Sequence, residues 1–345
     1  MFRMMDIIRN GGIYTIAEMS ANHAGKLENA LEIVKAVAWS GADCLKIQTY
    51  TPDTITINCH TDIFQEKGGL WDKEYLYDLY ARAYMPWEWQ QTIKDECTKH
   101  GLDFLSTPFD KTAVDFLEGI GCEAYKIASF EIVDIPLIVY AASKQKPMII
   151  SCGMASKEEI KEAIEACYSV GNNQVTILKC CSEYPSQPEN LHLDTIEDIQ
   201  KTFDVQVGLS DHSMGYLADV VAVAKGAKVI EKHFCLSRKI KNADSDFSME
   251  PAEFKEMVMN VNLAAKMSGS PFYGPSSGET EEYKSRRSLF AVEDIHAGDV
   301  LTEKNIRSIR PNAGLPPKLL PTLIGKRAKI DIPFGTPLKL DVIEE

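Results

Sequence analysis

The chain has 345 residues, of which 45% are hydrophobic and 25% charged, a composition that fits one large globular domain and a smaller one. Its net charge of −13 disfavours binding to the phosphate backbone of nucleic acids. No apolar run approaches the roughly 20 residues of a membrane-spanning helix. The first residues, MFRMMDIIRNGG, lack the pattern of a signal peptide. We therefore expect a cytoplasmic protein without nucleic-acid or membrane partners.

Nine cysteines are scattered along the chain, and none has the C-x-x-C spacing of a thiolate metal site. An odd number of cysteines without a framework is typical of reduced thiols in a cytosol. The acidic net charge does not exclude an anionic substrate, because a basic pocket can lie inside an acidic shell.

Eight short apolar runs recur along the chain, each followed by a helical pattern. The runs are 13–19, 43–49, 103–107, 124–129, 147–151, 174–179, 205–210 and 228–234. Apolar strands that alternate with amphipathic helices indicate a parallel sheet, and eight units indicate a closed (β/α)₈ barrel, also called a TIM barrel. An open doubly wound sheet is the alternative, but it would usually show a Gly-rich phosphate turn after the first strand. We predict a barrel over residues 1–270.

Two regions depart from the barrel repeat. Residues 50–89 form an aromatic insertion after the second strand, which we expect to be a packed helical elaboration with one or two side chains at the substrate. Residues 271–284, rich in Gly, Pro and Ser, are predicted to be a linker. The rest, residues 285–345, is predicted to be a small all-β module with strands at 288–294, 326–332 and 337–340.

Polar side chains cluster where the predicted strands end. These residues are Glu18, Lys46, Gln48, Thr107, Lys126, Ser129, Glu131, Ser151, Tyr184, Ser210, Asp211, His212, Glu231 and His233. Each one alone would be read as a solvated rim residue or a satisfied core group. Because the strand ends of a barrel converge on one pocket, the joint pattern predicts an active site.

Lys46 and Lys126 lie within apolar strands, where an unpaired ammonium is costly. With the neighbouring hydroxyls they would bind a phosphate and a carboxylate, although pairing with Glu18 or Glu131 is equally compatible. His212 and His233 end the last two strands, which lie about 4.8 Å apart, so their imidazoles could share one metal ion. Without cysteine ligands the site suits Mn²⁺ or Mg²⁺.

Six segments, in order, resemble the sialic acid synthase family: IAEMSANHAG, LKIQTY, FLSTPFD, YKIAS, GLSDHS and IEKHF. The resemblance covers nearly the whole chain and extends to IRPNAGL in the C-terminal module. It implies a barrel followed by an antifreeze-like (SAF) domain, and condensation of phosphoenolpyruvate with an N-acylated amino sugar. QTYTPDTITI and YKIASFEIVDIPLI resemble the pseudaminic acid synthase branch, whose sugar is a 2,4-diacetamido-2,4,6-trideoxy-altrose. N-acetylneuraminic or legionaminic acid synthesis is the alternative.

The resemblance also assigns roles to residues. Phosphoenolpyruvate would be bound by Lys46, Thr107, Lys126, Ser129, Ser151 and Ser210. The amino sugar would face Gln48, Glu131, Tyr184, Asp244 and Arg310. Glu18, Lys46, Lys126, His212, Glu231 and His233 would form the catalytic set. His212 and His233 would hold a divalent ion, Mn²⁺ first and Mg²⁺ or Co²⁺ as alternatives. Arg310 would come from the partner in a domain-swapped homodimer.

Two readings from other classes stay open at this point. The antifreeze-like module is compatible with a non-catalytic carbohydrate-binding protein, which the lysine, histidine and glutamate positions disfavour. A barrel aldolase that forms a lysine Schiff base is also possible. Borohydride trapping would reveal that mechanism, whereas sensitivity to EDTA would favour the metal-dependent one.

Overall fold

The computed structural model describes residues 2–344. The chain divides into two compact units, with the boundary between Gly269 and Ser270. The stretch predicted as a linker contains two short helical segments, a 3₁₀ turn at Ser277–Glu279 and α12 at Thr280–Tyr283, and it belongs to the second unit.

The first unit is a closed barrel of eight parallel strands in sequential order, which confirms the predicted fold. The strands are β1 (Tyr14–Glu18), β2 (Cys44–Thr49), β3 (Asp103–Pro108), β4 (Tyr125–Ile127), β5 (Met148–Ser151), β6 (Val175–Cys180), β7 (Gln206–Asp211) and β8 (Val229–His233). Each lies within about one residue of its predicted run, apart from the shorter β4. The barrel closes through pairing of β1 with β8, in which Glu18 is the register partner of His233.

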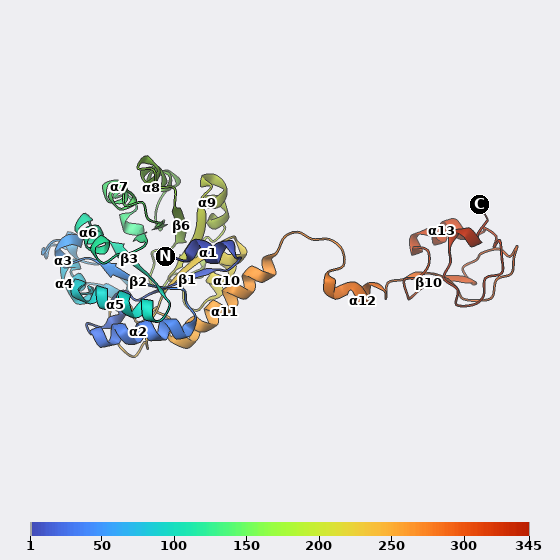
Figure 1. Cartoon of the computed structure of the whole chain (residues 1–345), viewed down its shortest axis with the longest axis horizontal. Coiled ribbons are helices and arrows are strands. Elements are labelled where there is room, and N and C mark those ends of the chain that lie inside the picture. The colour runs from blue at the N-terminus through green and yellow to red at the C-terminus, as the bar shows by residue number, and fades with distance from the viewer. Residues whose placement is uncertain (1, 345) are drawn as a thin grey trace. The chain divides into compact units, whose positions relative to one another are not determined.

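A ring of helices surrounds the strands (Figure 1). These helices are α2 (Leu27–Ser40), α5 (Trp87–Lys99), α6 (Lys111–Gly119), α7 (Ile135–Ala142), α8 (Lys157–Ser169), α9 (Thr195–Phe203), α10 (Leu217–Ala224) and α11 (Pro251–Ser268). Their apolar faces and the outward-facing strand residues form one continuous buried core. This packing leaves the ends of the strands and their loops free to carry chemistry.

Local sequence signals set several helix ends. The Asp110 side chain accepts hydrogen bonds from the Thr112 and Ala113 amides and caps α6. Ser156 and Glu159 form a capping box at the start of α8. Gly41, at φ +81°, ends α2 in a left-handed conformation that residues with a Cβ adopt rarely.

The end of the barrel nearest the strands' amino termini has an apolar interior. A short helix that the sequence analysis did not predict, α1 (Met4–Arg9), places Met4 against this interior. The cluster around it consists of Tyr14, Ile16, Cys44, Leu105, Ala124, Ile149, Leu178 and Val229. These residues are fully buried.

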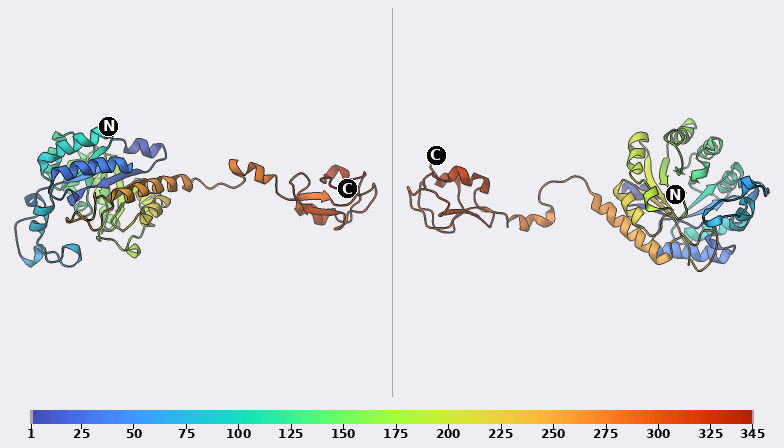
Figure 2. Two further views of the ribbon diagram at one scale, coloured as in Figure 1. Left: turned by 90° about the horizontal axis from the view of Figure 1, so that it is seen from below. Right: turned by 180° about the vertical axis from the view of Figure 1, so that it is seen from behind.

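The insertion after β2 is helical where predicted and extends away from the barrel wall (Figure 2). It contains α3 (Pro52–Ile55), two 3₁₀ turns (Asp62–Phe64 and Gly69–Trp71) and α4 (Leu76–Ala83). The Trp87 indole donates to the Tyr50 carbonyl at 3.0 Å, so α5 is tied to the end of β2.

The second unit is less regular than the predicted all-β module. Among its described residues there is one antiparallel strand pair, β9 (Ser288–Ala291) with β10 (Ile306–Ile309), and the latter strand was not predicted. The expected strands at 326–332 and 337–340 make only isolated bridges, such as Ile295 with Ile332. Short helical segments also occur, at Pro317–Leu319, α13 (Leu320–Leu323) and Leu340–Val342.

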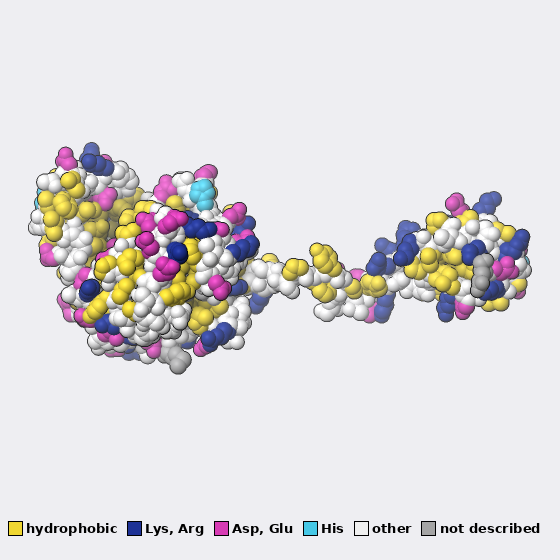
Figure 3. Space-filling model, turned by 90° about the horizontal axis from the view of Figure 1, so that it is seen from above, with side chains coloured by type: hydrophobic (Ala, Val, Ile, Leu, Met, Phe, Trp, Pro, Cys, Tyr) yellow, Lys and Arg dark blue, Asp and Glu magenta, His cyan; other side chains and the backbone are white. Residues whose placement is uncertain are grey.

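Charge is distributed unevenly between the two parts of the sequence. Residues 1–284 carry 42 acidic and 27 basic residues, whereas residues 285–345 carry 8 acidic and 10 basic ones. Lys and Arg side chains are prominent on the visible face of the second unit (Figure 3). Within the described residues, none of the helices combines the length and apolar character needed to cross a bilayer.

Candidate active site

Two lysines and two glutamates meet inside the barrel at the carboxyl ends of its strands. Lys46 Nζ lies 2.8 Å from Glu18 Oε2 and 3.4 Å from Glu231 Oε1. Lys126 Nζ lies 3.4 Å from the same Glu231 oxygen. All four residues are at most 4% exposed, so their charges act on one another with little screening by solvent.

The four groups shift one another's protonation. Burial, together with the Glu231 carboxylate, raises the pKa of Glu18 to about 7 against the opposing effect of Lys46. Burial alone would raise the pKa of Glu231, but Lys126 and Lys46 outweigh it and hold the pKa below its ordinary value. Burial lowers the pKa of Lys126. A carboxyl with a pKa near neutrality, such as Glu18, is suited to accept and return a proton.

Hydroxyl groups surround the two lysines. Lys126 Nζ donates to Ser151 Oγ at 2.6 Å, and Lys46 Nζ donates to Thr107 Oγ1 at 3.3 Å. Ser210 Oγ donates to Glu231 Oε1 at 3.4 Å. Two ammonium groups and three hydroxyls in one buried space match the oxygens of a phosphate and a carboxylate.

Gly153, which the sequence analysis missed, brings the backbone close to two further serine hydroxyls at the strand ends. The Gly153 amide donates to Ser129 Oγ at 3.0 Å. A Cβ at this position would lie 2.3 Å from Ser182 Oγ and 2.8 Å from Ser129 Oγ. Only glycine therefore lets the backbone approach these two serines.

His212 and His233 face each other at the adjoining ends of β7 and β8. Their ring centroids are 5.4 Å apart, and Tyr184 stacks on His212 at 4.2 Å. His212 Nδ1 lies 2.8 Å from the Cys181 carbonyl, to which it donates, so in the neutral ring the lone pair is on Nε2. Burial lowers the pKa of His212, but the Cys180 thiol and the Cys181 carbonyl outweigh it and raise the pKa above its ordinary value. His233 Nδ1 is buried without a hydrogen-bond partner.

The two histidines could bind one divalent ion between them, but that ion would need further ligands. A separation of 5.4 Å between ring centroids is compatible with two imidazoles that each bind one ion at about 2 Å. Burial lowers the pKa of His233 far below its ordinary value, and the neutral imidazole is the form that binds metals. Within residues 2–344, no three or more His, Cys, Asp or Glu side chains lie close enough together to bind one metal ion by themselves. The remaining ligands would have to come from substrate or water.

Asp211 directly precedes His212, but its carboxylate is engaged away from the two imidazoles, which does not support a role as a metal ligand or as a hydrogen-bond partner of the rings. Its carboxylate pairs with Lys232 and accepts hydrogen bonds from Ser213. Side chains alternate along a strand, so Asp211 points out of the barrel when Ser210 points in.

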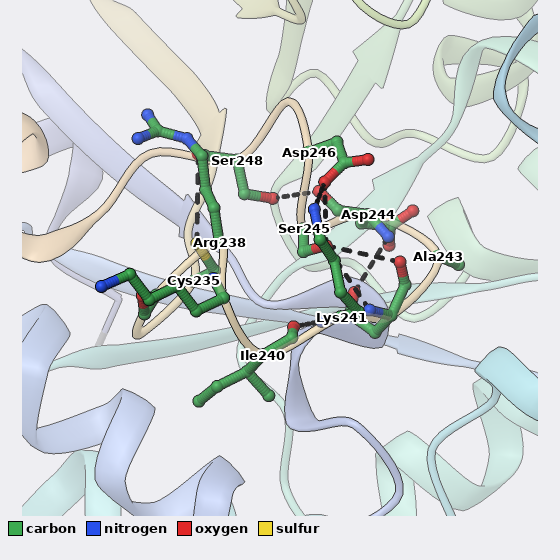
Figure 4. Close-up of polar contacts among 12 residues, drawn as sticks. Cys235, Arg238, Ile240, Lys241, Ala243, Asp244, Ser245, Asp246 and Ser248 are labelled. Atoms are coloured by element: carbon green, nitrogen blue, oxygen red, sulfur yellow. Dashed lines mark hydrogen bonds and ion pairs between the residues drawn. The ribbon is translucent and has the colours of Figure 1, made fainter.

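The loop from β8 to α11 holds Asp244 close to the end of β1 (Figure 4). Asp244 Oδ2 accepts the Ala21 amide at 3.0 Å, and Ser248 Oγ donates to the Asp244 carbonyl at 2.6 Å. Asn22 Nδ2 in turn donates to Ser248 Oγ at 2.9 Å. Asp244 thus anchors the β1 loop, a structural role in addition to the predicted contact with a sugar.

The remaining predicted sugar contacts fall into two groups. Gln48, the register partner of Thr107, and Glu131, in the turn after β4, are partly buried at the strand ends. Burial raises the pKa of Glu131 to about 7. Arg310, in contrast, is an exposed residue of the second unit.

Two aromatic residues complete the surroundings of Tyr184 and were not predicted individually. Trp71, from the insertion, lies 5.6 Å from the Tyr184 ring, and Phe247 lies 5.2 Å from it. The Trp71 indole also donates to the Ala243 carbonyl at 3.1 Å. The expectation that one or two insertion aromatics approach the site agrees with the position of Trp71, although the local sequence does not single it out.

Both parts of the chain are similar to known proteins. The NeuB family profile matches residues 33–272, and the SAF domain profile matches residues 286–344. The chain is 45% identical over 330 residues to a pseudaminic acid synthase of Campylobacter jejuni, covering 95% of each chain. It is 43% identical over 331 residues to a pseudaminic acid synthase of Helicobacter pylori, covering 95% of this chain and 97% of the relative.

A solved structure is also similar. The N-acetylneuraminic acid synthetase of Leptospira borgpetersenii, crystallised with citrate, matches with a TM-score of 0.70 and 31% identity over 79% of this chain and 90% of that one. The resemblance seen in the six sequence segments is thereby confirmed.

Proposed function

Because the chain belongs to the NeuB family, we propose that it is a pseudaminic acid synthase. It condenses phosphoenolpyruvate with 2,4-diacetamido-2,4,6-trideoxy-β-L-altropyranose and water, and it releases phosphate. The observation that carries the proposal is the buried pair of Lys46 and Lys126 among hydroxyls, at the same strand ends as the imidazoles of His212 and His233. The chain is more similar to pseudaminic acid synthases, at 43–45% identity, than to neuraminic or legionaminic acid synthases, at 31–32% identity, which favours this sugar over the N-acetylneuraminic or legionaminic precursors.

The chain's own residues account for most of the chemistry. C3 of phosphoenolpyruvate attacks the aldehyde carbon of the open-chain sugar, and positive charge develops at C2. Water then adds at C2, and the bond from C2 to the phosphate oxygen breaks. Lys46, Lys126 and the adjacent hydroxyls hold the phosphate and carboxylate throughout, so positioning and fixed charge supply the catalysis. Glu18, whose pKa is raised to about 7 by burial, takes the proton from the attacking water, and this proton balances the one that the former aldehyde oxygen gains to become a hydroxyl.

A divalent ion held by His212 and His233, Mn²⁺ before Mg²⁺ or Co²⁺, would polarise the aldehyde oxygen as a Lewis acid. The orphaned nitrogen of His233 and the fixed tautomer of His212 support this assignment. Substitution of either histidine by alanine should abolish bound metal and nearly all turnover, with the fold retained. Metal analysis that finds wild-type content in both variants would overturn the assignment.

The substrate assignment is tested with a panel of amino sugars. Each sugar is incubated with phosphoenolpyruvate and Mn²⁺, and the nine-carbon product is detected by mass. Turnover of the 2,4-diacetamido-trideoxy-altrose well above the N-acetylmannosamine and legionaminic-type sugars supports the proposal. In ¹⁸O-labelled water the label should enter the sugar acid and not the phosphate. Label in the phosphate would contradict attack of water at C2.

The Schiff-base alternative has one observation in its favour, namely the lowered pKa of Lys126. That lysine is, however, engaged by Ser151 and Glu231 and is 2% exposed. Borohydride added with both substrates should therefore leave the mass of the protein unchanged. A covalent adduct on Lys126 would replace the condensation mechanism with an aldolase mechanism.

We also propose that Arg310 completes the site of a second copy in a cytoplasmic homodimer. The excess of basic residues in 285–345 and of acidic residues in 1–284 supports docking of one copy's module on the other's barrel. The nine free cysteines support a reducing compartment. Mixed Arg310→Ala and Lys126→Ala subunits should regain activity, since one of the two sites in a mixed dimer is intact. Confirmed subunit exchange without activity would exclude action in trans.

A further inference from the structure

A buried ionic cluster lies outside the barrel, directly behind the two imidazoles, and the proposed chemistry does not use it. Its members are Lys232 on β8, Asp211 on β7, Asp219 on α10, and Ser213 just after β7. The Lys232 side chain is 1% exposed, and the side chains of both aspartates are fully buried. We call these four residues the clasp.

Lys232 is the centre of the clasp. Its Nζ pairs with Asp211 Oδ2, donates to the Ser213 carbonyl at 2.7 Å, and lies 3.9 Å from Asp219 Oδ2. Asp211 closes the other side, because its Oδ1 accepts the Ser213 amide at 2.8 Å and its Oδ2 accepts the Ser213 hydroxyl at 3.0 Å. One ammonium therefore connects β7, β8 and the first turn of α10.

The clasp residues flank both histidines in the sequence. Asp211 and Ser213 come immediately before and after His212, and Lys232 comes immediately before His233. Asp211 and Lys232 are also register partners across the β7–β8 pair. Since side chains alternate along a strand, outward contacts at 211 and 232 fix the backbone from which the two imidazoles point inward.

We propose that Lys232 is a positioning residue that sets the separation of the His212 and His233 imidazoles, and through it the affinity for a divalent ion. The inference rests on the proposed function, because it presupposes that the two histidines bind a metal. Directional bonds from one ammonium to a carboxylate and a carbonyl fix a geometry that an apolar pair of similar volume would leave looser. Lys232 itself touches no reacting atom.

The test compares Lys232→Met with a matched control. Lys146 also pairs with a carboxylate, that of Glu118, and donates to a main-chain carbonyl, that of Cys122, at 2.6 Å. It is more exposed than Lys232, at 24% against 1%, and it lies just before the start of β5, away from the carboxyl ends of β7 and β8 that carry the imidazoles. Lys146→Met should therefore lose an ion pair without a change at the histidines.

Calorimetry with Mn²⁺ measures the metal affinity of the wild type, both lysine variants and His233→Ala. We expect Lys232→Met to bind Mn²⁺ about 10- to 100-fold more weakly, the usual effect of removing a group that orients a ligand. Lys146→Met should stay within about twofold of the wild type. The Mn²⁺ resonance spectrum should change in Lys232→Met alone, and excess Mn²⁺ should restore its turnover without a change in the KM for phosphoenolpyruvate.

The outcomes separate the inference from the proposed function. If the wild type and His233→Ala bind Mn²⁺ equally, or neither binds it, the metal assignment itself is wrong. If the wild type binds through His233 and folded Lys232→Met binds within twofold of it, Lys232 is only structural and the inference is overturned. Should Lys232→Met fail to fold, Ser213→Ala removes a single hydrogen bond of the clasp, and unchanged Mn²⁺ affinity and an unchanged spectrum in that variant would likewise overturn it.

Discussion

The two ends of the barrel interior differ in kind, although the same eight strands build both. At the amino ends of the strands the interior is a cluster of apolar side chains closed off by Met4 of α1. At the carboxyl ends it contains two lysines, two glutamates and two histidines, all buried. Buried charges contribute little net stability and often reduce it, whereas apolar packing stabilises. The apolar packing that stabilises the barrel therefore lies at the amino ends of the strands, and the groups suited to catalysis lie at the carboxyl ends of the same strands.

The comparison predicts the largest effect on activity for Lys126→Met, a substitution that removes the ammonium and keeps the volume. Turnover should fall at least about a hundredfold, because a preorganised charge at the phosphate is lost. Stability should change by less than about 1 kcal/mol, since Lys46 still faces Glu231 at 3.4 Å and the cost of burying the second ammonium disappears. Steady-state kinetics and urea unfolding measure the two quantities. A loss of several kcal/mol would mean that the ionic end also holds the barrel together.

Met4→Ala should have the opposite effect. Met4 is 2% exposed against the apolar cluster, and its truncation should lower the unfolding free energy by about 2–4 kcal/mol. The kcat at a temperature where the variant is folded should remain within about twofold of the wild type, because α1 lies at the other end of the strands. Urea unfolding and kinetics at 20 °C provide the check. A large loss of kcat in the folded variant would contradict the conclusion that the apolar end of the barrel contributes to stability and not to catalysis.

The charged residues at the carboxyl ends of the strands were more predictable from the sequence than the features around them. Lys46 and Lys126 are charged residues inside apolar strands, and His212 and His233 end adjacent strands, so strand order alone brings them together. The same alternation also determines that Asp211 and Lys232 point outward, but their partnership with Ser213 depends on the path of the loop after β7.

Other features had no local signal. Trp71 contacts Tyr184 only because its part of the insertion is bound to the loop after β8, where its indole donates to the Ala243 carbonyl. The helix α1 is so short that its packing, and not its own periodicity, stabilises it. The alternating pattern of residues 326–332 predicts a strand, yet this segment finds only single-bridge partners in the small second unit. Tertiary contacts outweigh β-propensity there.

The smallest predicted effect concerns Glu131, whose pKa burial raises to about 7 and whose Oε2 is buried without a hydrogen-bond partner. In the unfolded chain its carboxyl has an ordinary pKa near 4.5. Between pH 4.5 and about 7 the folded protein keeps a proton that the unfolded chain has released, so this group's contribution to stability falls as pH rises and is fully lost above about 7.

The amide of the Glu131→Gln variant cannot ionise, so the substitution should remove the pH-dependent contribution of Glu131 to stability. The difference in unfolding free energy between the variant and the wild type should grow in favour of the variant by roughly 1–3 kcal/mol from pH 4.5 to 8. Glu18, which is also raised to about 7, is present in both proteins and cancels in the difference. Urea unfolding at several pH values without metal or substrate measures this. If the difference in unfolding free energy between the two proteins stays constant with pH, Glu131 is ionised in the folded protein. Solvent would then reach its carboxylate at the turn after β4.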